Sequence, residues 1–256
     1  MEGIILKDDT RYDYTEKYLQ KKGYFINPHA EPSDLDFAVF PFLGQTDEAI
    51  YDDGFFTALK KNAPVFSGIR NKYLSEKCAK YGIAYYVMMD DKGVTVKNAV
   101  PTSEGVISYL INSLNRTVAN SRILVIGYGV CGRDLSLRLT ALGANVYALV
   151  RNREKECAAY ADSATPIYHD EMCDHTFDAI VNTVPKCVLS DEDLKHTNQA
   201  VLIDIASKPY GFNMELAKKI NSKSALLPGL PGKLSPQTAG EILGEYIDFV
   251  LRGTTK

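Results

Sequence analysis

The sequence has no apolar run that approaches the roughly 20 residues a helix needs to cross a lipid bilayer. Its first residues, MEGIILKDDTRY, contain no apolar core long enough for a secretory signal. The five cysteines are scattered without a C-x-x-C pair, which is typical of a reduced cytoplasmic protein and not of a disulfide scaffold. The net charge of −3 shows no excess of positive charge that would indicate nucleic acid as the main partner. We therefore expect a cytoplasmic protein that binds neither membranes nor nucleic acid.

The histidines and cysteines match no zinc-binding spacing, so we expect no metal site. The chain of 256 residues is long for one domain and natural for two, at about 150 residues per domain. It is 45% apolar and 24% charged, which is ordinary for a globular protein, and it has no internal repeat or low-complexity segment.

Short β-type runs alternate with helical runs along the whole chain, which indicates α/β architecture. In the first part, strands are expected at GIIL (3–6), FAVFPF (37–42), APVFSG (63–68) and IAYYVM (83–88). Helices are expected between them over residues 12–22, 54–61 and 71–82. This pattern predicts a small flavodoxin-like or Rossmann-like domain over residues 1–100.

A further helix is expected next, because residues 106–114 place apolar side chains at helical spacing. Pro101 should precede this helix, since proline lacks the N–H that a helix interior requires. Thr102 or Ser103 would then cap its start. Gly105 in the first turn favours close packing of another segment against this position, with simple tolerance of a glycine as the alternative.

A glycine motif opens the second part of the chain. Residues 122–151 read as strand, turn, helix and strand, and GYGVCG has the G-x-G-x-x-G spacing at the turn. Gly127 permits the tight turn, Gly129 lets the backbone approach a pyrophosphate, and Gly132 lets helix and strand meet closely. The helix N-terminus supplies N–H groups for the anion. We predict a Rossmann NADP-binding domain over residues 101–235. The cofactor-binding residues expected in this turn are Gly127, Tyr128, Gly129, Val130, Cys131 and Gly132.

The second strand of this domain ends in RNR, that is Arg151, Asn152 and Arg153. An acidic residue is expected near this position when the cofactor is NAD. A carboxylate would repel a 2′-phosphate, whereas a guanidinium can bind it with two hydrogen bonds. The sequence therefore favours NADP, although solvated surface arginines remain the alternative.

Two later strand ends point to the same crevice, because ligands lie outside the carboxyl ends of parallel strands. Ordinary turn chemistry is the alternative for each residue. The additional cofactor-binding residues expected there are Thr183, Val184, Pro185, Ala206 and Ser207.

The segment PGLPG (228–232), within LPGLPGKLSPQTAGEIL, directly follows the last short strand, SALL. A flexible linker would contain glycine and serine without the prolines, so this segment is expected to form a rigid wall of an inter-domain cleft. Ser235 and Pro236 are suited to begin a helix. We predict that this C-terminal helix, over residues 236–256, returns to the domain junction.

Five segments together resemble a known family: SGIRNKYL (67–74), NAVPTSEG (98–105), GYGVCG (127–132), DIASKP (204–209) and LPGLPGKLSPQTAGEIL (227–243). The chain is similar over nearly its whole length to the family of dipicolinate synthase A subunits, which act in bacterial sporulation. The resemblance implies NADP-dependent oxidation of a dihydrodipicolinate-type precursor to pyridine-2,6-dicarboxylate. It also implies a flavoprotein-like second subunit and leaves open whether the chain forms a homo-oligomer.

A substrate with two carboxylates needs cationic partners. The resemblance implies that the N-terminal domain carries substrate-binding and catalytic residues. The substrate-binding candidates are Arg11, Ser67, Gly68, Arg70, Pro228, Gly229, Leu230, Pro231 and Gly232. The candidates for orienting the ring or carrying a proton are Asn71, Asn98, Thr102, Glu104 and Lys208.

The sequence departs from the family at four positions. Lys7 and Asp8 replace glycines, Arg70 replaces a small residue, and Lys208 replaces arginine. Two alternatives therefore stay open. One is an NADP-dependent dehydrogenase of another small carboxylate, and the other is a non-catalytic nucleotide-binding protein that serves as a scaffold or redox sensor for its partner.

Overall fold

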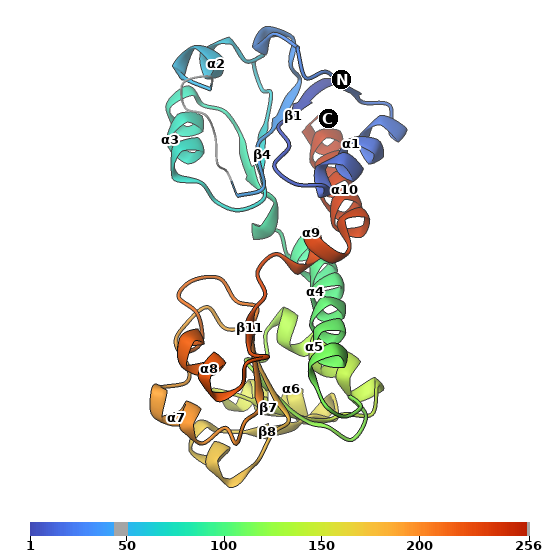
Figure 1. The fold of residues 1–256 in the computed structure, drawn as a ribbon. Coiled ribbons are helices and arrows are strands. Elements are labelled where there is room, and N and C mark those ends of the chain that lie inside the picture. The colour runs from blue at the N-terminus through green and yellow to red at the C-terminus, as the bar shows by residue number, and fades with distance from the viewer. Residues whose placement is uncertain (44–50, 255–256) are drawn as a thin grey trace. The chain divides into compact units, whose positions relative to one another are not determined.

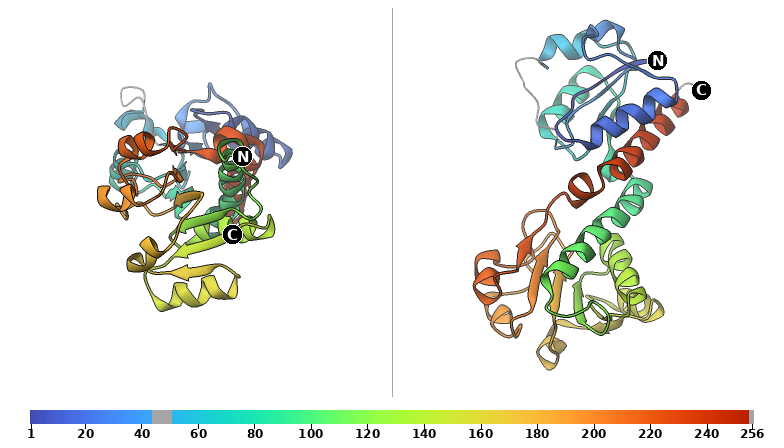
Figure 2. Two further views of the ribbon diagram at one scale, coloured as in Figure 1. Left: turned by 60° about the horizontal axis from the view of Figure 1, so that its bottom comes forward. Right: turned by 45° about the vertical axis from the view of Figure 1, so that its right-hand side comes forward.

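The computed structural model describes residues 1–43 and 51–254 (Figure 1, Figure 2). The chain divides into two compact units, the first formed by Met1–Asn98 with Pro231–Lys256 and the second by Ala99–Leu230. The last two residues of the predicted C-terminal segment, 255 and 256, lie outside the described residues.

The first unit contains a five-stranded parallel sheet in the order β2-β1-β3-β4-β5. This is the doubly wound order of flavodoxin-like folds, with the order reversing between β1 and β3. The fold class predicted from the alternating pattern is confirmed. The strands are β1 (Glu2–Ile5), β2 (Phe25–Ile26), β3 (Phe37–Val39), β4 (Val65–Ser67) and β5 (Tyr85–Val87).

Helices cover both faces of this sheet because successive strand residues point to opposite sides. Ile5 and Val39 pack in one core with α1 and α10, whereas Ile4 and Ala38 pack in the other core with α2 and α3. α1 and α10 lie side by side (Figure 2). The helices of the unit are α1 (Arg11–Lys21), η1 (Pro32–Asp34), α2 (Asp53–Ala58), α3 (Lys72–Tyr81), η2 (Met88–Asp90) and α10 (Pro236–Thr254).

Glycines on α10 allow its close approach to α1. A Cβ atom on Gly240 would lie only 2.1 Å from the carbonyl oxygen of Arg11, and one on Gly244 would lie 2.8 Å from the ring of Tyr18. The hydroxyl of Thr15 donates a hydrogen bond to the carbonyl of Gly240 at 2.9 Å. α10 is therefore part of the first unit through backbone-level contact with α1.

We expect Gly240→Ala to lower the free energy of unfolding by about 1–3 kcal/mol, because the added methyl group overpacks this contact. Urea denaturation measures the change. Gly253→Ala is the matched control on the same helix, because a Cβ there meets nothing within 4 Å. Equal effects of the two substitutions on stability would contradict the close-packing account.

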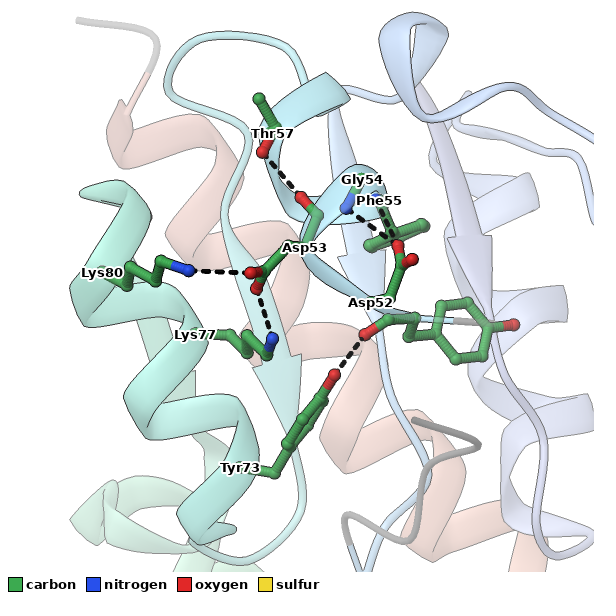
Figure 3. A network of polar contacts seen from close by, with 9 residues as sticks. Asp52, Asp53, Gly54, Phe55, Thr57, Tyr73, Lys77 and Lys80 are labelled. Atoms are coloured by element: carbon green, nitrogen blue, oxygen red, sulfur yellow. Dashed lines mark hydrogen bonds and ion pairs between the residues drawn. The ribbon is translucent and has the colours of Figure 1, made fainter. Parts of the chain in front are cut away.

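A polar network ties α2 to α3 (Figure 3). Asp52 caps α2, and the carboxylate of Asp53 pairs with Lys77 and with Lys80, the latter at 2.7 Å. The hydrogen bond from Lys77, followed by that from Lys80, holds the pKa of Asp53 below its usual range. These contacts lie at the surface and fix a short helix whose own six residues would be marginal in isolation.

The prediction for Pro101 was wrong, because α4 (Lys92–Ser113) runs through this residue. Asp91 starts the helix, its carboxylate accepting a hydrogen bond from the N–H of Val94 at 2.9 Å. The buried side chains of Val94 and Ala99 before the proline and Val106 after it hold the helix on both sides. Burial thus outweighs the cost of an interior proline, about 3 kcal/mol.

The close packing expected at Gly105 is confirmed within the second unit. A Cβ on Gly105 would lie 3.1 Å from the side chain of Leu230. Thr102 and Ser103, predicted as alternative caps, lie instead in the interior of α4.

The second unit contains a six-stranded parallel sheet in the order β11-β10-β9-β6-β7-β8. This is the dinucleotide-binding Rossmann order, and it reverses between β6 and β9. The central strands read as continuous apolar runs because both faces are covered. The strands are β6 (Arg122–Ile126), β7 (Asn145–Leu149), β8 (Thr165–Ile167), β9 (Ala179–Asn182), β10 (Val201–Asp204) and β11 (Ala225–Leu226).

One core of this unit contains side chains of α4, α5 and α6, and the other contains side chains of η3, α7 and α8. None of the helices in the described part of the chain is long and apolar enough to cross a membrane. The remaining helices are α5 (Val130–Ala141), α6 (Arg153–Ala161), η3 (His169–Asp174), α7 (Asp191–Lys195), α8 (Met214–Ile220) and α9 (Leu230–Leu234).

Candidate functional site

The carboxyl ends of four neighbouring strands meet at one edge of the second sheet. Ile126 at the end of β6 pairs with Leu149 of β7 on one side and with Asn182 of β9 on the other. Asn182 in turn pairs with Asp204 at the end of β10. The segments that follow these strands therefore emerge together at the point where the strand order reverses. Crevices for ligands form at such points in open α/β sheets.

The glycine turn after β6 has the geometry that a pyrophosphate requires. Gly127 has a φ of +90°, a conformation that residues with side chains rarely adopt. A Cβ on Gly132 would lie 2.1 Å from the carbonyl oxygen of Gly127, so only glycine lets α5 approach the turn. A Cβ on Gly129 meets nothing within 4 Å, so the backbone here is open to a ligand.

This turn places the N-terminus of α5 at the open backbone of Gly129. Gly129 is the N-cap residue, and no side chain of the described residues caps the helix. The first-turn N–H groups and the positive end of the helix dipole therefore remain for an anion. An open backbone, a close helix–strand contact and an uncapped helix start together fit a dinucleotide pyrophosphate.

The side chain of Tyr128 has a structural partner. It is buried, and its hydroxyl donates a hydrogen bond to Asp162 at 3.0 Å. Arg133 donates to the same carboxylate at 2.6 Å, which ties α5 to the end of α6. Burial, followed by the bond to Asp162, raises the pKa of Tyr128. Of the other turn residues, Val130 is exposed, and burial raises the pKa of the Cys131 thiol.

Of the three residues after β7, one has a structural role and two have exposed side chains. Asn152 caps α6, its side-chain oxygen accepting from the N–H of Lys155 at 3.0 Å. Arg151 and Arg153 are exposed, and neither has a hydrogen-bond or ion-pair partner among the described residues. Two free guanidinium groups therefore flank the start of α6, at the sheet edge that carries the glycine turn.

The residues after β9 pack against the turn from the other side. The hydroxyl of Thr183 donates to the carbonyl of Ile126 at 2.8 Å, and a Cβ on Gly127 would lie 2.4 Å from the Val184 side chain. Pro185 is exposed. After β10, Ala206 is buried and Ser207 is exposed. The predicted cofactor residues are thus brought to one edge of the sheet.

Two buried polar residues, Asn182 and Asp204, belong to the two strand ends that the sequence pointed to, but neither was among the predicted cofactor-binding residues. Both are completely inaccessible to solvent and are joined by a hydrogen bond of 3.0 Å. The available signal was a polar residue at the last position of each of two apolar strands.

Three predicted substrate-binding residues gather in the first unit. Arg11 is buried and binds Asp9 at 2.7 Å, and its guanidinium lies 3.8 Å from the centre of the Phe42 ring. Gly68 packs against the same ring, and Gly232 packs against the Arg11 guanidinium. This cluster lies where the chain leaves β1, β3 and β4, at the carboxyl edge of the first sheet.

The other candidates of the β4–α3 region have structural partners. Ser67 is buried, and its hydroxyl hydrogen bonds with the hydroxyl of Tyr85 at 2.6 Å. Arg70 is 65% exposed in its side chain and pairs with Asp90. Asn71 caps α3 by accepting from the N–H of Leu74 at 3.0 Å.

The remaining candidates lie on α4, on the loop after β10 and in the proline–glycine segment. Asn98, Thr102 and Glu104 belong to α4, and Glu104 lies 3.8 Å from the Arg138 guanidinium. Lys208 is exposed.

The proline–glycine segment, which the sequence predicts as a rigid wall, is divided between a turn and a short helix. Pro228 and Gly229 form an exposed turn, whereas Leu230, Pro231 and Gly232 are buried in the first turn of α9. The helix α10 does begin at Pro236, as expected. Among the described residues, no group of three or more histidine, cysteine or acidic side chains is arranged to hold a metal ion.

Comparison with known proteins shows which of them this chain is similar to. No model of a known protein family matches the sequence. The A subunit of dipicolinate synthase from Bacillus subtilis (strain 168) is 32% identical over 190 residues. This chain is a relative of the dipicolinate synthase A subunit. The aligned residues make up 73% of this chain but only 64%, less than two thirds, of that relative.

Solved structures extend the likeness across both units. The crystal structure of the dipicolinate synthase A subunit from Bacillus halodurans has a TM-score of 0.87 and 24% identity, covering 98% of this chain and 97% of that one. D-Lactate dehydrogenase from Lactobacillus jensenii, solved with NAD+, has a TM-score of 0.62 and 12% identity, covering 99% and 97% of the two chains. The resemblance to dipicolinate synthase A subunits seen in the sequence is confirmed, and the two structures share the fold of this chain.

Proposed function

We propose that this chain uses NADP to oxidise a dihydrodipicolinate-type ring to pyridine-2,6-dicarboxylate in the cytoplasm. The observation that carries the proposal is the open glycine turn at Gly129, in a relative of the dipicolinate synthase A subunit. The Rossmann strand order and the uncapped α5 support a nicotinamide dinucleotide as the cofactor.

The preference for NADP over NAD rests on the residues after β7. NAD-binding sites place an acidic side chain there for the ribose hydroxyls. This chain has Arg151 and Arg153, both exposed and without partners among the described residues. Unpaired guanidinium groups suit a 2′-phosphate, to which they can donate charge-assisted hydrogen bonds.

In the proposed reaction, this chain mainly binds the substrate ring and the cofactor and orients them. The bound nicotinamide would accept a hydride from the dihydro ring, which becomes aromatic as it also loses a proton. The protein has to hold the ring at the right distance and angle and to neutralise two carboxylates. We propose these roles for the predicted substrate-binding residues, among which the cluster of Arg11, Gly68 and Gly232 is already packed together.

The Arg11 guanidinium already has partners, which limits its capacity to bind a substrate carboxylate. The Asp9 carboxylate already binds the Arg11 guanidinium, and Phe42 covers one of its faces. We therefore propose that Arg11 shapes the carboxyl edge of the first sheet and contributes fewer free N–H donors than an unpaired arginine. The roles of Asn71, Asn98, Thr102, Glu104 and Lys208 in orienting the ring or moving a proton also remain proposals.

A second, flavoprotein-like subunit is part of the proposal, because the related protein is named as one subunit of its enzyme. The direct test is steady-state turnover with NADP, a dihydrodipicolinate-type precursor and the second subunit, followed by NADPH absorbance. NADPH formation that requires this chain supports the proposal. NADPH formation in its absence, or none in its presence, contradicts it.

An alternative is an NADP-dependent dehydrogenase of another small carboxylate. It is favoured by Lys7, which replaces a glycine of the family pattern and pairs with Asp13 at 2.8 Å and Glu16 at 2.6 Å. These ion pairs tie the turn after β1 to α1 at the carboxyl edge of the sheet. Turnover of other small carboxylates, but not of the dihydrodipicolinate precursor, would establish this alternative.

We expect Arg70→Met and Lys208→Met each to weaken dipicolinate binding by about 1 kcal/mol or less, because both side chains are exposed and exposed ion pairs are worth little in water. Arg70 already pairs with Asp90. Titration calorimetry with dipicolinate in the presence of NADP measures the change, and a loss of about 3 kcal/mol or more would show that the ligand buries these groups.

A further inference from the structure

Two buried polar side chains organise the loops that follow β9 and β10. Asn182 donates to an Asp204 carboxylate oxygen at 3.0 Å. The same oxygen accepts from the N–H of Ala206 at 2.9 Å, and the other oxygen accepts from the N–H of Gly211 at 2.6 Å. Among the described residues, no cationic side chain pairs with Asp204. Its two side-chain oxygens are therefore satisfied by N–H donors, all from the residues that it positions.

These bonds close each loop at its base. Asp204 holds both ends of the segment 205–211, one with each carboxylate oxygen. Asn182 fixes Val184 through two bonds, donating to its carbonyl at 3.0 Å and accepting from its N–H at 3.1 Å. The carbonyl of Gly211 accepts from the N–H groups of Val188 and Leu189, which joins the two loops.

Gly211 is fitted to this arrangement. A Cβ at this position would lie 2.3 Å from the amide of Asn182. The loop after β10 can therefore reach the two polar side chains only with glycine at this point. The network therefore depends on Asn182, Asp204 and Gly211 together.

The position of the loops indicates what they face. A Rossmann sheet is built from two mononucleotide-binding halves, and the strand order of this unit reverses between β6 and β9. Arg151 and Arg153 follow β7, where the proposed function puts the 2′-phosphate, so the loops after β9 and β10 would border the opposite half. Val184 packs against Gly127 of the glycine turn, and Ser207 and Lys208 are exposed on the second loop.

We infer that Asn182 and Asp204 are positioning residues that hold segments 183–185 and 205–211 against the nicotinamide half of the cofactor. The inference rests on the proposed dinucleotide site. If the two side chains only stabilised the unit, replacing them would weaken the binding of both halves of the cofactor. If they position the two segments, replacing them should weaken only the contacts with the nicotinamide half. The two halves can be probed separately, because adenosine 2′,5′-bisphosphate contains the adenosine 2′-phosphate and lacks the nicotinamide.

The test compares three variants by titration calorimetry with NADPH and with adenosine 2′,5′-bisphosphate. Asp204→Asn replaces an acceptor with an amide donor and leaves one buried N–H group unpaired. Gly211→Ala disturbs the same loop and leaves the carboxylate intact, in case the first variant fails to fold. Asp178→Asn is the matched control, because Asp178 accepts from the N–H of Arg122 at 2.7 Å at the opposite edge of the same sheet.

We expect Asp204→Asn and Gly211→Ala to weaken NADPH binding by about tenfold or more, with adenosine 2′,5′-bisphosphate binding within about twofold of wild type. Asp178→Asn should change neither affinity. Equal losses for both ligands, or no loss for NADPH, would overturn the inference while the proposed cofactor stands. A wild-type chain that binds neither ligand would overturn both.

Discussion

Replacing Gly129 with valine is expected to leave the fold intact and to reduce the affinity for NADPH by about a hundredfold or more. Gly129 has an extended backbone, with φ of −86° and ψ of −163°, which valine adopts without strain. A Cβ there meets no protein atom within 4 Å. The valine side chain would occupy the space through which the pyrophosphate reaches the N–H groups of α5. Losing two charge-assisted hydrogen bonds accounts for an effect of this size.

The control for this variant is Gly132→Ala. Its Cβ would lie 2.1 Å from the carbonyl oxygen of Gly127, so the substitution forces apart the strand and the helix. Gly132→Ala should lower both the melting temperature and the affinity, whereas Gly129→Val should lower the affinity alone. NADPH binding by Gly129→Val at wild-type strength, measured by titration calorimetry, would remove the pyrophosphate from this turn.

The second large effect concerns Arg151. We expect Arg151→Asp to weaken NADPH binding by about 1.5–3 kcal/mol, the value of a hydrogen bond to a charged group, and to leave NADH binding unchanged or tighter. The new carboxylate repels a 2′-phosphate and can accept hydrogen bonds from ribose hydroxyls. The preference for NADPH should therefore reverse.

Arg116→Asp serves as the charge-matched control, because Arg116 is an exposed arginine near Asp178, at the amino edge of the same sheet. It changes the net charge equally and should affect the two cofactors alike. If Arg116→Asp lowers the preference for NADPH as much as Arg151→Asp does, the preference arises from long-range charge and Arg151 does not contact the 2′-phosphate.

Much of the fold was predictable because its signals are local. The order of strands and helices follows from alternating runs, and the spacing of Gly127, Gly129 and Gly132 placed the turn between β6 and α5. Each of these glycines proved to have its own geometric reason, a positive φ, an open backbone or a close contact. The start of α10 at Pro236 was also predicted from a local signal.

The parts that were not predictable depend on tertiary contacts. Pro101 lies inside α4 because burial on both sides of it outweighs its local preference. Tyr128 belongs to the glycine motif, yet its side chain is bound to Asp162, which lies far along the sequence. Asn182 and Asp204 were visible in the sequence as the polar ends of two apolar strands, the second within DIASKP, but their mutual hydrogen bond depends on the fold.

The most direct test of the central claim is titration calorimetry of the wild-type chain with NADPH and with NADH under identical conditions. The account predicts that NADPH binds at least about tenfold more tightly, because Arg151 and Arg153 have no other partners among the described residues. Equal affinities would contradict the assignment of the arginines to a 2′-phosphate. The absence of binding by either dinucleotide would contradict the cofactor site itself.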